Sequence, residues 1–230
     1  MRVHLVIAFV LCTASTAAAQ AVSDSKLWLS GTGEADLTHM LRAGASLELR
    51  NGADSGYDQT RVGLELGIKL NKYFGFDVFY VLMLRDGDPR LGTVDETRHR
   101  IGVDANQRFD TDRLTIGNRI RLHNTTYELD SDHVHLRDKV HVGYEVVEHV
   151  TPYVALELIY LLSPKSEYRE TRFYVGVDWH AMKRLDLGAF FLRQVETNVQ
   201  MPEHNNIIGL EATYLFRRVK KHKIEPADHD

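Results

Sequence analysis

Charged side chains occupy every second position in several stretches of this sequence. Arg98 and Arg100 form one such pair, and Arg119 and Arg121 form another. Because successive side chains of a β-strand point to opposite faces, each stretch predicts a strand with one charged face. The residues predicted to line the inside of a closed sheet are Arg98, Arg100, Arg108, Arg113, Arg119, Arg121, Glu48, Glu65, Asp77, Asp104, Glu145, Glu157, Arg172, Asp178 and Glu211.

Two roles can be proposed for such a charged interior. A ladder of arginines along a solute path would favour anions, as charged rings do in pores. A narrow barrel would instead let long side chains of opposite sign meet across its interior, where unpaired charges are costly. The mixed signs favour the second interpretation, a plug of salt bridges, because a selective pore would be lined more nearly by one sign.

Catalytic chemistry has weaker support in the sequence. Ser131-Asp132-His133 places a serine beside an aspartate and a histidine, but adjacent loop residues rarely have triad geometry, and Ser and Asp are common in turns. Asp130, Asp132, His133 and His135 are ligand types for a divalent cation, without a fixed spacing. We therefore predict no enzymatic activity, no metal site and no cofactor, with a lipid-modifying barrel enzyme as an alternative.

The stretch from residue 61 to residue 85 shows the predicted strands most clearly. Its first half alternates apolar residues with charged residues and glycines, Asn71-Lys72 interrupts the pattern, and the second half resumes it. A two-residue polar break between alternating stretches predicts a hairpin. Strands of ~10 residues with one apolar and one charged face are the signature of a membrane β-barrel. A soluble ligand-binding barrel or sandwich is the alternative, although soluble strands usually have only ~5–6 residues.

The N-terminus predicts export from the cytoplasm. Arg2 precedes an apolar run from Val3 to Leu11, and Ala17-Ala18-Ala19 follows as a small-residue cleavage site, so residues 1–19 are predicted to be a signal peptide. Cys12 is the single cysteine and lies within this segment, so the mature chain is expected to have no disulfide. The net charge of −4 gives no electrostatic case for binding nucleic acid.

Alternating stretches continue to residue 216, with breaks of unequal length between them. The breaks after residues 37, 70, 109, 148 and 180 are short, and those after residues 50, 85, 124, 162 and 195 are longer. Bacterial outer-membrane barrels have short periplasmic turns, longer external loops and an even number of strands. We count about eleven stretches and therefore predict twelve strands, with ten as the alternative, because the first stretch either splits near Gly31-Thr32-Gly33 or has a different boundary.

Several of these features resemble one protein family. They are Leu27-Trp28 soon after the signal, the strand ending Leu47-Glu48-Leu49-Arg50, the repeated Arg-x-Arg strands, and the closing Tyr-x-Phe that ends at Phe216. On these motifs, most of the mature chain resembles the short outer-membrane barrels catalogued as domain of unknown function 2490 (DUF2490). The resemblance implies a location and a fold and supplies no activity or catalytic residues. The charged segment after Phe216 departs from the usual end of such a barrel.

Together these observations predict an all-β protein, a closed antiparallel transmembrane β-barrel over residues 20–216 with a charged periplasmic tail over residues 217–230. The expected location is the outer membrane of a Gram-negative bacterium. Expected partners are outer-membrane lipid, the barrel-assembly machinery during biogenesis and an unidentified small solute, but no nucleic acid. The expected role is passive, as either a small channel or a structural barrel plugged by charges.

Overall fold

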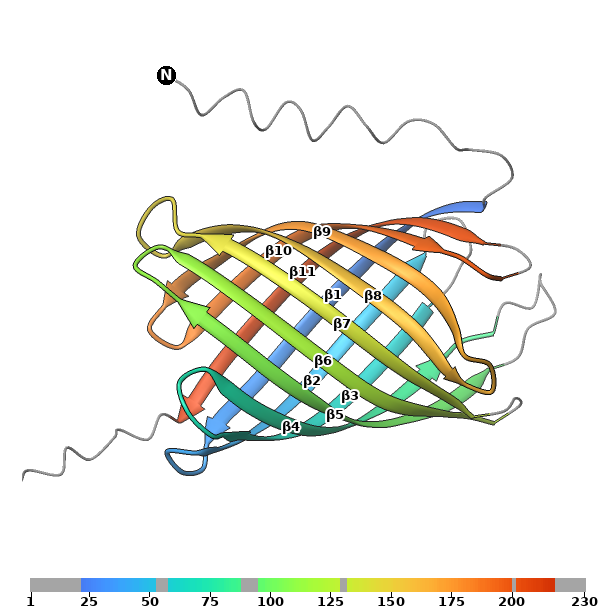
Figure 1. Cartoon of the computed structure of the whole chain (residues 1–230), viewed down its shortest axis with the longest axis horizontal. Helices are drawn as coiled ribbons and strands as arrows, with labels where there is room; N and C mark the ends of the chain where they lie inside the picture. Colours follow the sequence, from blue (N-terminus) through green and yellow to red (C-terminus); the bar gives the residue numbers. More distant parts are fainter. Residues whose placement is uncertain (1–21, 53–57, 88–94, 129–131, 200–201, 218–230) are drawn as a thin grey trace, which may run out of the picture.

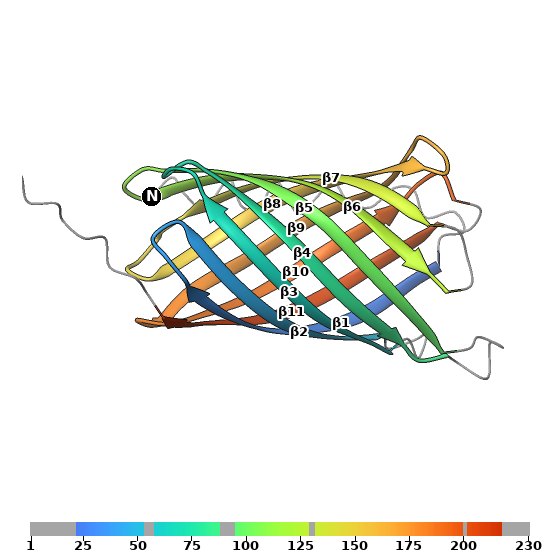
Figure 2. The ribbon, with the colours of Figure 1, turned by 90° about the horizontal axis from the view of Figure 1, so that it is seen from below.

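The computed structural model of the protein is a closed barrel of eleven strands and describes residues 22–52, 58–87, 95–128, 132–199 and 202–217 (Figure 1, Figure 2). The strands are β1 (Val22–Asp36), β2 (Leu41–Gly52), β3 (Asp58–Lys69), β4 (Phe74–Arg85), β5 (Glu96–Asp110), β6 (Leu114–Tyr127), β7 (His133–Tyr144), β8 (Val150–Ser163), β9 (Glu167–Met182), β10 (Leu185–Glu196) and β11 (Glu203–Arg217). No helix among the described residues could cross a membrane. The predicted signal peptide, and the predicted tail beyond Arg217, lie outside the described residues.

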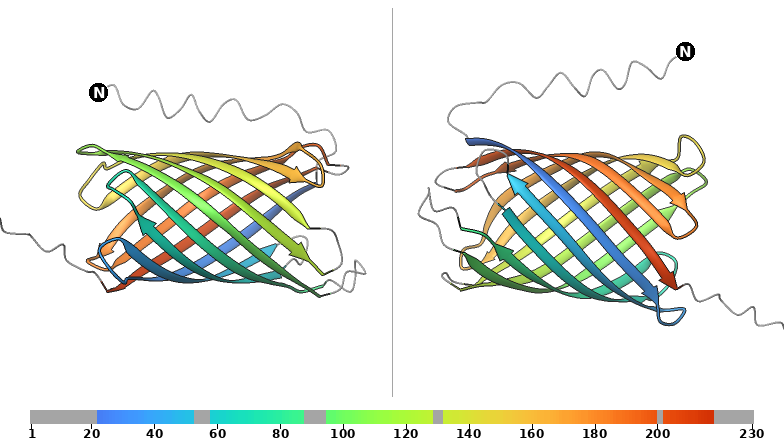
Figure 3. Two further views of the ribbon diagram at one scale, coloured as in Figure 1. Left: turned by 60° about the horizontal axis from the view of Figure 1, so that its bottom comes forward. Right: turned by 180° about the vertical axis from the view of Figure 1, so that it is seen from behind.

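The barrel closes through one parallel pair of strands. Consecutive strands are antiparallel, but β1 and β11 lie side by side and run in the same direction (Figure 3). Val22 pairs with Glu203 at one end of this seam and Gly33 pairs with Tyr214 near the other. A meander with an odd number of strands can close only in this way, because its first and last strands point the same way. The prediction of twelve strands, and the alternative of ten, are therefore wrong, and β1 continues unbroken through Gly31 and Gly33.

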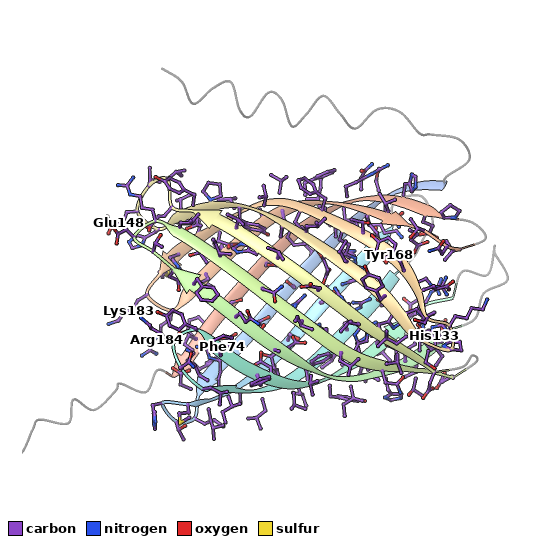
Figure 4. The ribbon with its side chains drawn as sticks, viewed as in Figure 1. Phe74, His133, Glu148, Tyr168, Lys183 and Arg184 are labelled. Carbon is purple, nitrogen blue, oxygen red and sulfur yellow. The ribbon has the colours of Figure 1, made fainter. Side chains whose placement is uncertain are left out.

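The connections between strands fall at two ends of the barrel. The turn end carries the connections after β1, β3, β5, β7 and β9, with two to five residues each, and the loop end carries the others, with three to ten. Phe74, Glu148, Lys183 and Arg184 mark the turn end in Figure 4, and His133 marks the loop end. The difference in length is smaller than the sequence predicted, because β6 and β9 extend into stretches predicted to be loops.

The outer face of the barrel is apolar. Among the described residues 42 large hydrophobic side chains are exposed, whereas ten hydrophobic residues are buried. The exposed positions alternate along most strands and fall opposite one another across strands, as Leu64, Tyr80 and Ile101 do. Asn118 and Asp138 interrupt this face, and the Asn118 amide donates a hydrogen bond of 2.6 Å to the Asp138 carboxylate. The protein is therefore inside-out compared with a soluble barrel.

A shallow apolar groove of about 590 Å³ crosses this outer face at the β1–β11 seam. Small residues leave the space: Gly31 pairs with Ala212, and nothing lies within 4 Å of the position that a Gly31 Cβ would occupy. Leucines 29, 47 and 49, Trp179 and Leu210 are among the larger residues of its lining. Its lining also includes Ser30, Gly188 and Glu211, which alternate with the outward-facing residues on these strands.

Candidate functional site

Glu157 of β8 is the centre of the ion pairs inside the barrel, and its side chain is fully buried. The Arg137 Nη2 donates hydrogen bonds of 2.8 and 2.9 Å to the two carboxylate oxygens, and Arg119 Nη2 donates one of 3.2 Å to Oε1. The Tyr174 hydroxyl donates to Oε2 at 3.0 Å, and Arg172 Nη1 lies 3.8 Å from the same oxygen. Several donors therefore compensate for the loss of water around this carboxylate, as a buried charge requires.

Strand register explains why these charges meet. Arg119 of β6 pairs with Lys139 of β7, Lys139 pairs with Glu157, and Glu157 pairs with Arg172 of β9. Directly opposed residues on neighbouring strands have Cβ atoms about 4.5–5.5 Å apart, so long side chains in one such row reach each other. Arg172 also pairs with the carboxylate of Glu170 on its own strand. The row therefore places one carboxylate among three cations on the inner wall.

Asp104 and Arg121 form a second ion pair beside this row. Arg121 donates bonds of 2.7 Å from Nε and 2.6 Å from Nη2, one to each oxygen of Asp104, which is 2% exposed. The Arg121 guanidinium also lies 4.2 Å from the centre of the Phe79 ring. A two-pronged guanidinium–carboxylate contact is strong and geometrically specific, so this pair holds β5 and β6 in register inside the barrel.

Glu48 of β2 accepts the third group of ion pairs. Arg50 donates to Glu48, and the Arg61 Nη1 lies 3.6 Å from the same carboxylate oxygen. The Arg50 guanidinium stacks 3.5 Å from the centre of the Trp28 ring, and the Arg172 guanidinium lies 5.7 Å from that ring. Trp28 therefore connects the charges near the barrel seam to those around Glu157 through cation–π contacts.

Apolar side chains complete the filling of the middle of the barrel. Trp28, Tyr174, Phe190, Leu192 and Ile207 form one buried cluster, in which Leu192 and Ile207 are 0% exposed. The Phe190 ring lies over its neighbour Gly209, where a Cβ would overlap the ring. Aromatic rings over glycines and ion pairs together close the middle of the lumen, which we call the plug.

The inner wall near the turn end is more open. Glu65, Asp178 and Glu211 are exposed although they point inward, and within the described residues none of them has a cation within 4.0 Å. Glu65 pairs across strands with Gly44, and both Asp178 and Glu211 pair with Gly188. Because a glycine carries no side chain, water reaches the carboxylate opposite it. We call this region the acidic vestibule.

The other predicted lining residues lie outside these two regions or at their edges. Arg98 donates a bond of 2.5 Å to Glu96 near the loop end, and Asp77 accepts one from Asn106 towards the turn end. Arg108 pairs with Asp110 at 2.9 Å and is largely exposed. Two predicted residues are not on the strands: Arg113 lies in the turn before β6 and Glu145 in the turn after β7, because the strands are shorter there than the alternation suggested.

Several residues of the plug were not predicted from the sequence. Arg137 and Lys139 continue the Arg-x-Arg pattern on β7, so the same alternation could have identified them. Arg50 and Arg61 likewise stand on predicted charged faces. The apolar members, such as Tyr174 and Leu192, carry no such signal, since apolar residues were expected on the outer face alone.

The described histidines at the loop end contact one another and Tyr127. His123 and His135 stack with ring centres 5.1 Å apart, and His133 contacts His135 and Tyr127 by ring edges. Asp132 accepts hydrogen bonds from Asn124 and Thr126, while Asp130 and Ser131 lie outside the described residues. In the part of the chain that the structure describes, no group of three or more His, Cys, Asp or Glu side chains is arranged to hold a metal ion.

Comparisons with known proteins place the chain in a family. The family described as "Protein of unknown function (DUF2490)" matches residues 26–205, most of the barrel, so the chain belongs to this family. A comparison with curated proteins gave no match. Among solved structures the chain is similar to the translocator domain of the autotransporter NalP from Neisseria meningitidis, with a TM-score of 0.45, 11% identity, and 79% of this chain and 76% of that chain covered.

Proposed function

We propose that this protein is a passive outer-membrane β-barrel whose lumen is closed by the plug. The apolar outer face is the observation that carries the proposal. Soluble monomers rarely expose contiguous apolar patches larger than a few hundred Å². Here every strand carries at least one exposed large hydrophobic residue and all but β10 carry two or more, as lipid contact requires. Outer-membrane lipid is the partner that fits this face, and a barrel of this kind would depend on the barrel-assembly machinery for insertion.

Polar side chains on the outer face, such as Asn118 with Asp138 and Arg193 with Asn206, are hydrogen-bonded to each other. A charged residue facing hydrocarbon destabilises a membrane barrel, most strongly near the midplane. Asp138 is only partly exposed and accepts the hydrogen bond from Asn118 on the neighbouring strand. This bond lowers the cost of placing the carboxylate on the apolar face.

The plug supports a closed lumen over an open pore. It combines a fully buried carboxylate, the cations around it and a buried aromatic cluster at the middle of the barrel. An open pore would need a continuous water path between the barrel ends. The acidic vestibule opens to the turn end and stops at the plug. The barrel is therefore a structural protein or a channel closed at rest.

Conductance in a planar bilayer tests the proposal. Protein refolded without residues 1–19 is first checked for a heat-shifted gel band. In cells that express the full chain, extraction by detergent but not by osmotic shock is expected. Wild-type protein is expected to give no conductance steps. Arg137→Ala removes the strongest donor to Glu157, and steps are then expected, whereas the exposed Arg108→Ala should stay silent. Release of the protein by osmotic shock would contradict the location, and wild-type steps as large as those of Arg137→Ala would contradict the closed lumen.

A small anion-selective channel is the second candidate. The number of cations favours it: six arginines (residues 50, 61, 119, 121, 137 and 172) share the four carboxylates of Glu48, Asp104, Glu157 and Glu170 in and around the plug, and Arg100 adds a further positive charge. In a salt gradient, a reversal potential shifted towards the anion would support this candidate, provided that Arg119→Ala reduces the shift.

A further inference from the structure

Arg100 of β5 differs from the other arginines around the plug. Its Nε donates a bond of 3.0 Å to the Thr125 hydroxyl on β6. Among the described residues, no carboxylate lies within ion-pair distance of its guanidinium, and its Nη atoms make no hydrogen bond. Arg100 faces the interior at the loop-end side of the plug, since it pairs with Val81 and Thr125 in the rows nearer that end.

The charges around Arg100 are positive. Arg137, Arg50 and Arg121 are the cations that act on it most strongly. The neighbouring imidazoles of His123 and His135 add no anion. Like charges in a partly water-excluded space repel one another, so this arrangement needs a compensating negative charge.

The nearby carboxylates are already engaged with other cations. Asp104 binds Arg121 with both oxygens, and Glu157 accepts bonds from Arg119 and Arg137. Glu48 is paired with Arg50 and Arg61. Each of these three carboxylates already has at least one arginine as its partner. The described residues therefore leave Arg100 without a compensating carboxylate.

We propose that Arg100 is the anchor of an oxyanion-binding site in the loop-end half of the lumen, which takes a small phosphate or carboxylate solute. The planar guanidinium presents two parallel N–H donors that match such a group. Arg50, Arg121 and Arg137 supply the surrounding positive potential without giving up their own partners. The site deepens the proposed function and rests on it in that the barrel must be closed by the plug; it further requires that the loop-end half of the lumen admits water.

Inorganic phosphate is the probe. The barrel is folded in an uncharged detergent, so that no lipid headgroup competes, with chloride salt at equal ionic strength as the blank. Binding is followed by the fluorescence of Trp28, whose ring contacts the Arg50 and Arg172 guanidinium groups. Trp179→Phe removes the fluorescence of the other tryptophan, which lies on the outer face. Equilibrium dialysis with labelled phosphate measures the binding directly.

We expect saturable binding of phosphate that also raises the unfolding temperature. Arg100→Gln should weaken binding by at least about tenfold, in line with the loss of a charge-assisted pair, and should abolish the thermal shift. Arg100→Lys keeps the positive charge but lacks the two parallel N–H donors. Its affinity for phosphate should therefore lie between those of wild type and Arg100→Gln. Arg108→Gln, on the same strand but paired with Asp110 at the turn end, should bind as wild type does.

Three results would overturn the site: no saturable binding to wild type, unchanged binding in Arg100→Gln, or an equal loss in Arg108→Gln. Arg100→Gln should fold, because it removes a repelling charge and no carboxylate loses a partner. The heat-shifted band confirms folding, and Thr125→Val, which frees the Arg100 Nε, gives a second variant with a smaller expected loss. The titration needs neither a bilayer nor conductance, so its outcome is separable from that of the proposed function.

Discussion

The plug and the acidic vestibule lie along the same inner wall, but the carboxylates of the two regions have opposite surroundings. In the plug, Glu157 is 0% exposed and Asp104 is 2% exposed, and each binds at least one arginine. In the vestibule, Glu65 and Glu211 are exposed and have no cation within 4.0 Å among the described residues. The same residue type thus forms a buried ion pair in one region of the barrel and an exposed carboxyl group in the other.

The residue opposite each carboxylate makes the difference. Glu157 pairs with Lys139 and Arg172, whereas Glu211 pairs with Gly188 and Ser30. Strands β2, β6 and β10 all begin with Leu-x-x-Gly, which places Gly44, Gly117 and Gly188 on the inner wall near the turn end. A Cβ at Gly44 would have no atom nearer than 3.8 Å. Space at these positions admits water, so the vestibule carboxylates need no partner.

Removal of the plug carboxylate is expected to have the largest effect on stability. Glu157→Gln leaves three guanidinium groups around a neutral amide, and we expect the free energy of unfolding to fall by about 3–5 kcal/mol. Glu211→Gln is the matched change in the vestibule and should alter it by no more than about 0.5 kcal/mol. Urea unfolding of both variants in lipid vesicles, followed by tryptophan fluorescence, measures the difference. Equal losses would show that the two regions do not differ as described.

The second largest difference is expected in the rate at which single cysteines in the two regions react with a water-soluble thiol reagent. The only cysteine of the sequence is Cys12, so variants of a chain that begins after residue 19 carry one thiol each. Asp178→Cys in the vestibule should react with a charged methanethiosulfonate on the order of a hundredfold faster than Ala155→Cys, since residue 155 is 3% exposed and reaction needs access. Similar rates would mean that the plug admits water as freely as the vestibule.

Glycine positions offer a third comparison. Gly209→Ala would drive a methyl group into the Phe190 ring, and we expect a loss of about 1–3 kcal/mol in the free energy of unfolding. Gly44→Ala has room and should be neutral or stabilising by up to about 1 kcal/mol, because alanine restricts the unfolded chain. Denaturant titration of the pair measures both, and a costly Gly44→Ala would indicate that the vestibule wall is already packed.

The smallest effect is expected at the exposed ion pair of the turn end. The Arg108 and Asp110 side chains are 66% and 49% exposed. Arg108→Gln should lower the free energy of unfolding by less than about 1 kcal/mol, and that difference should shrink further in high salt. Unfolding at two salt concentrations measures it. A larger, salt-independent loss would show that this ion pair is shielded from solvent, as the ion pairs of the plug are.

Local sequence patterns predicted much of the fold. Alternation along residues 61–85 indicated β3 and β4 with the correct faces, as Leu64 and Phe79 show by their opposite exposure. The eleven alternating stretches also matched the strands of the structure, and the error arose when an even number was required of them. Closure by the parallel β1–β11 pair is not visible in any one stretch, because it joins segments nearly two hundred residues apart.

The candidate site was predictable only in part, for the same reason. The sequence by itself determined which side chains share a face, because a strand's period of two is local. It placed Arg100, Arg119 and Glu157 on charged faces without indicating their partners. Tertiary structure decided that Glu157 meets Arg137, that Arg100 meets no carboxylate among the described residues, and that Glu211 faces a glycine. Those outcomes depend on the register between strands, and a register is set by packing of the whole barrel.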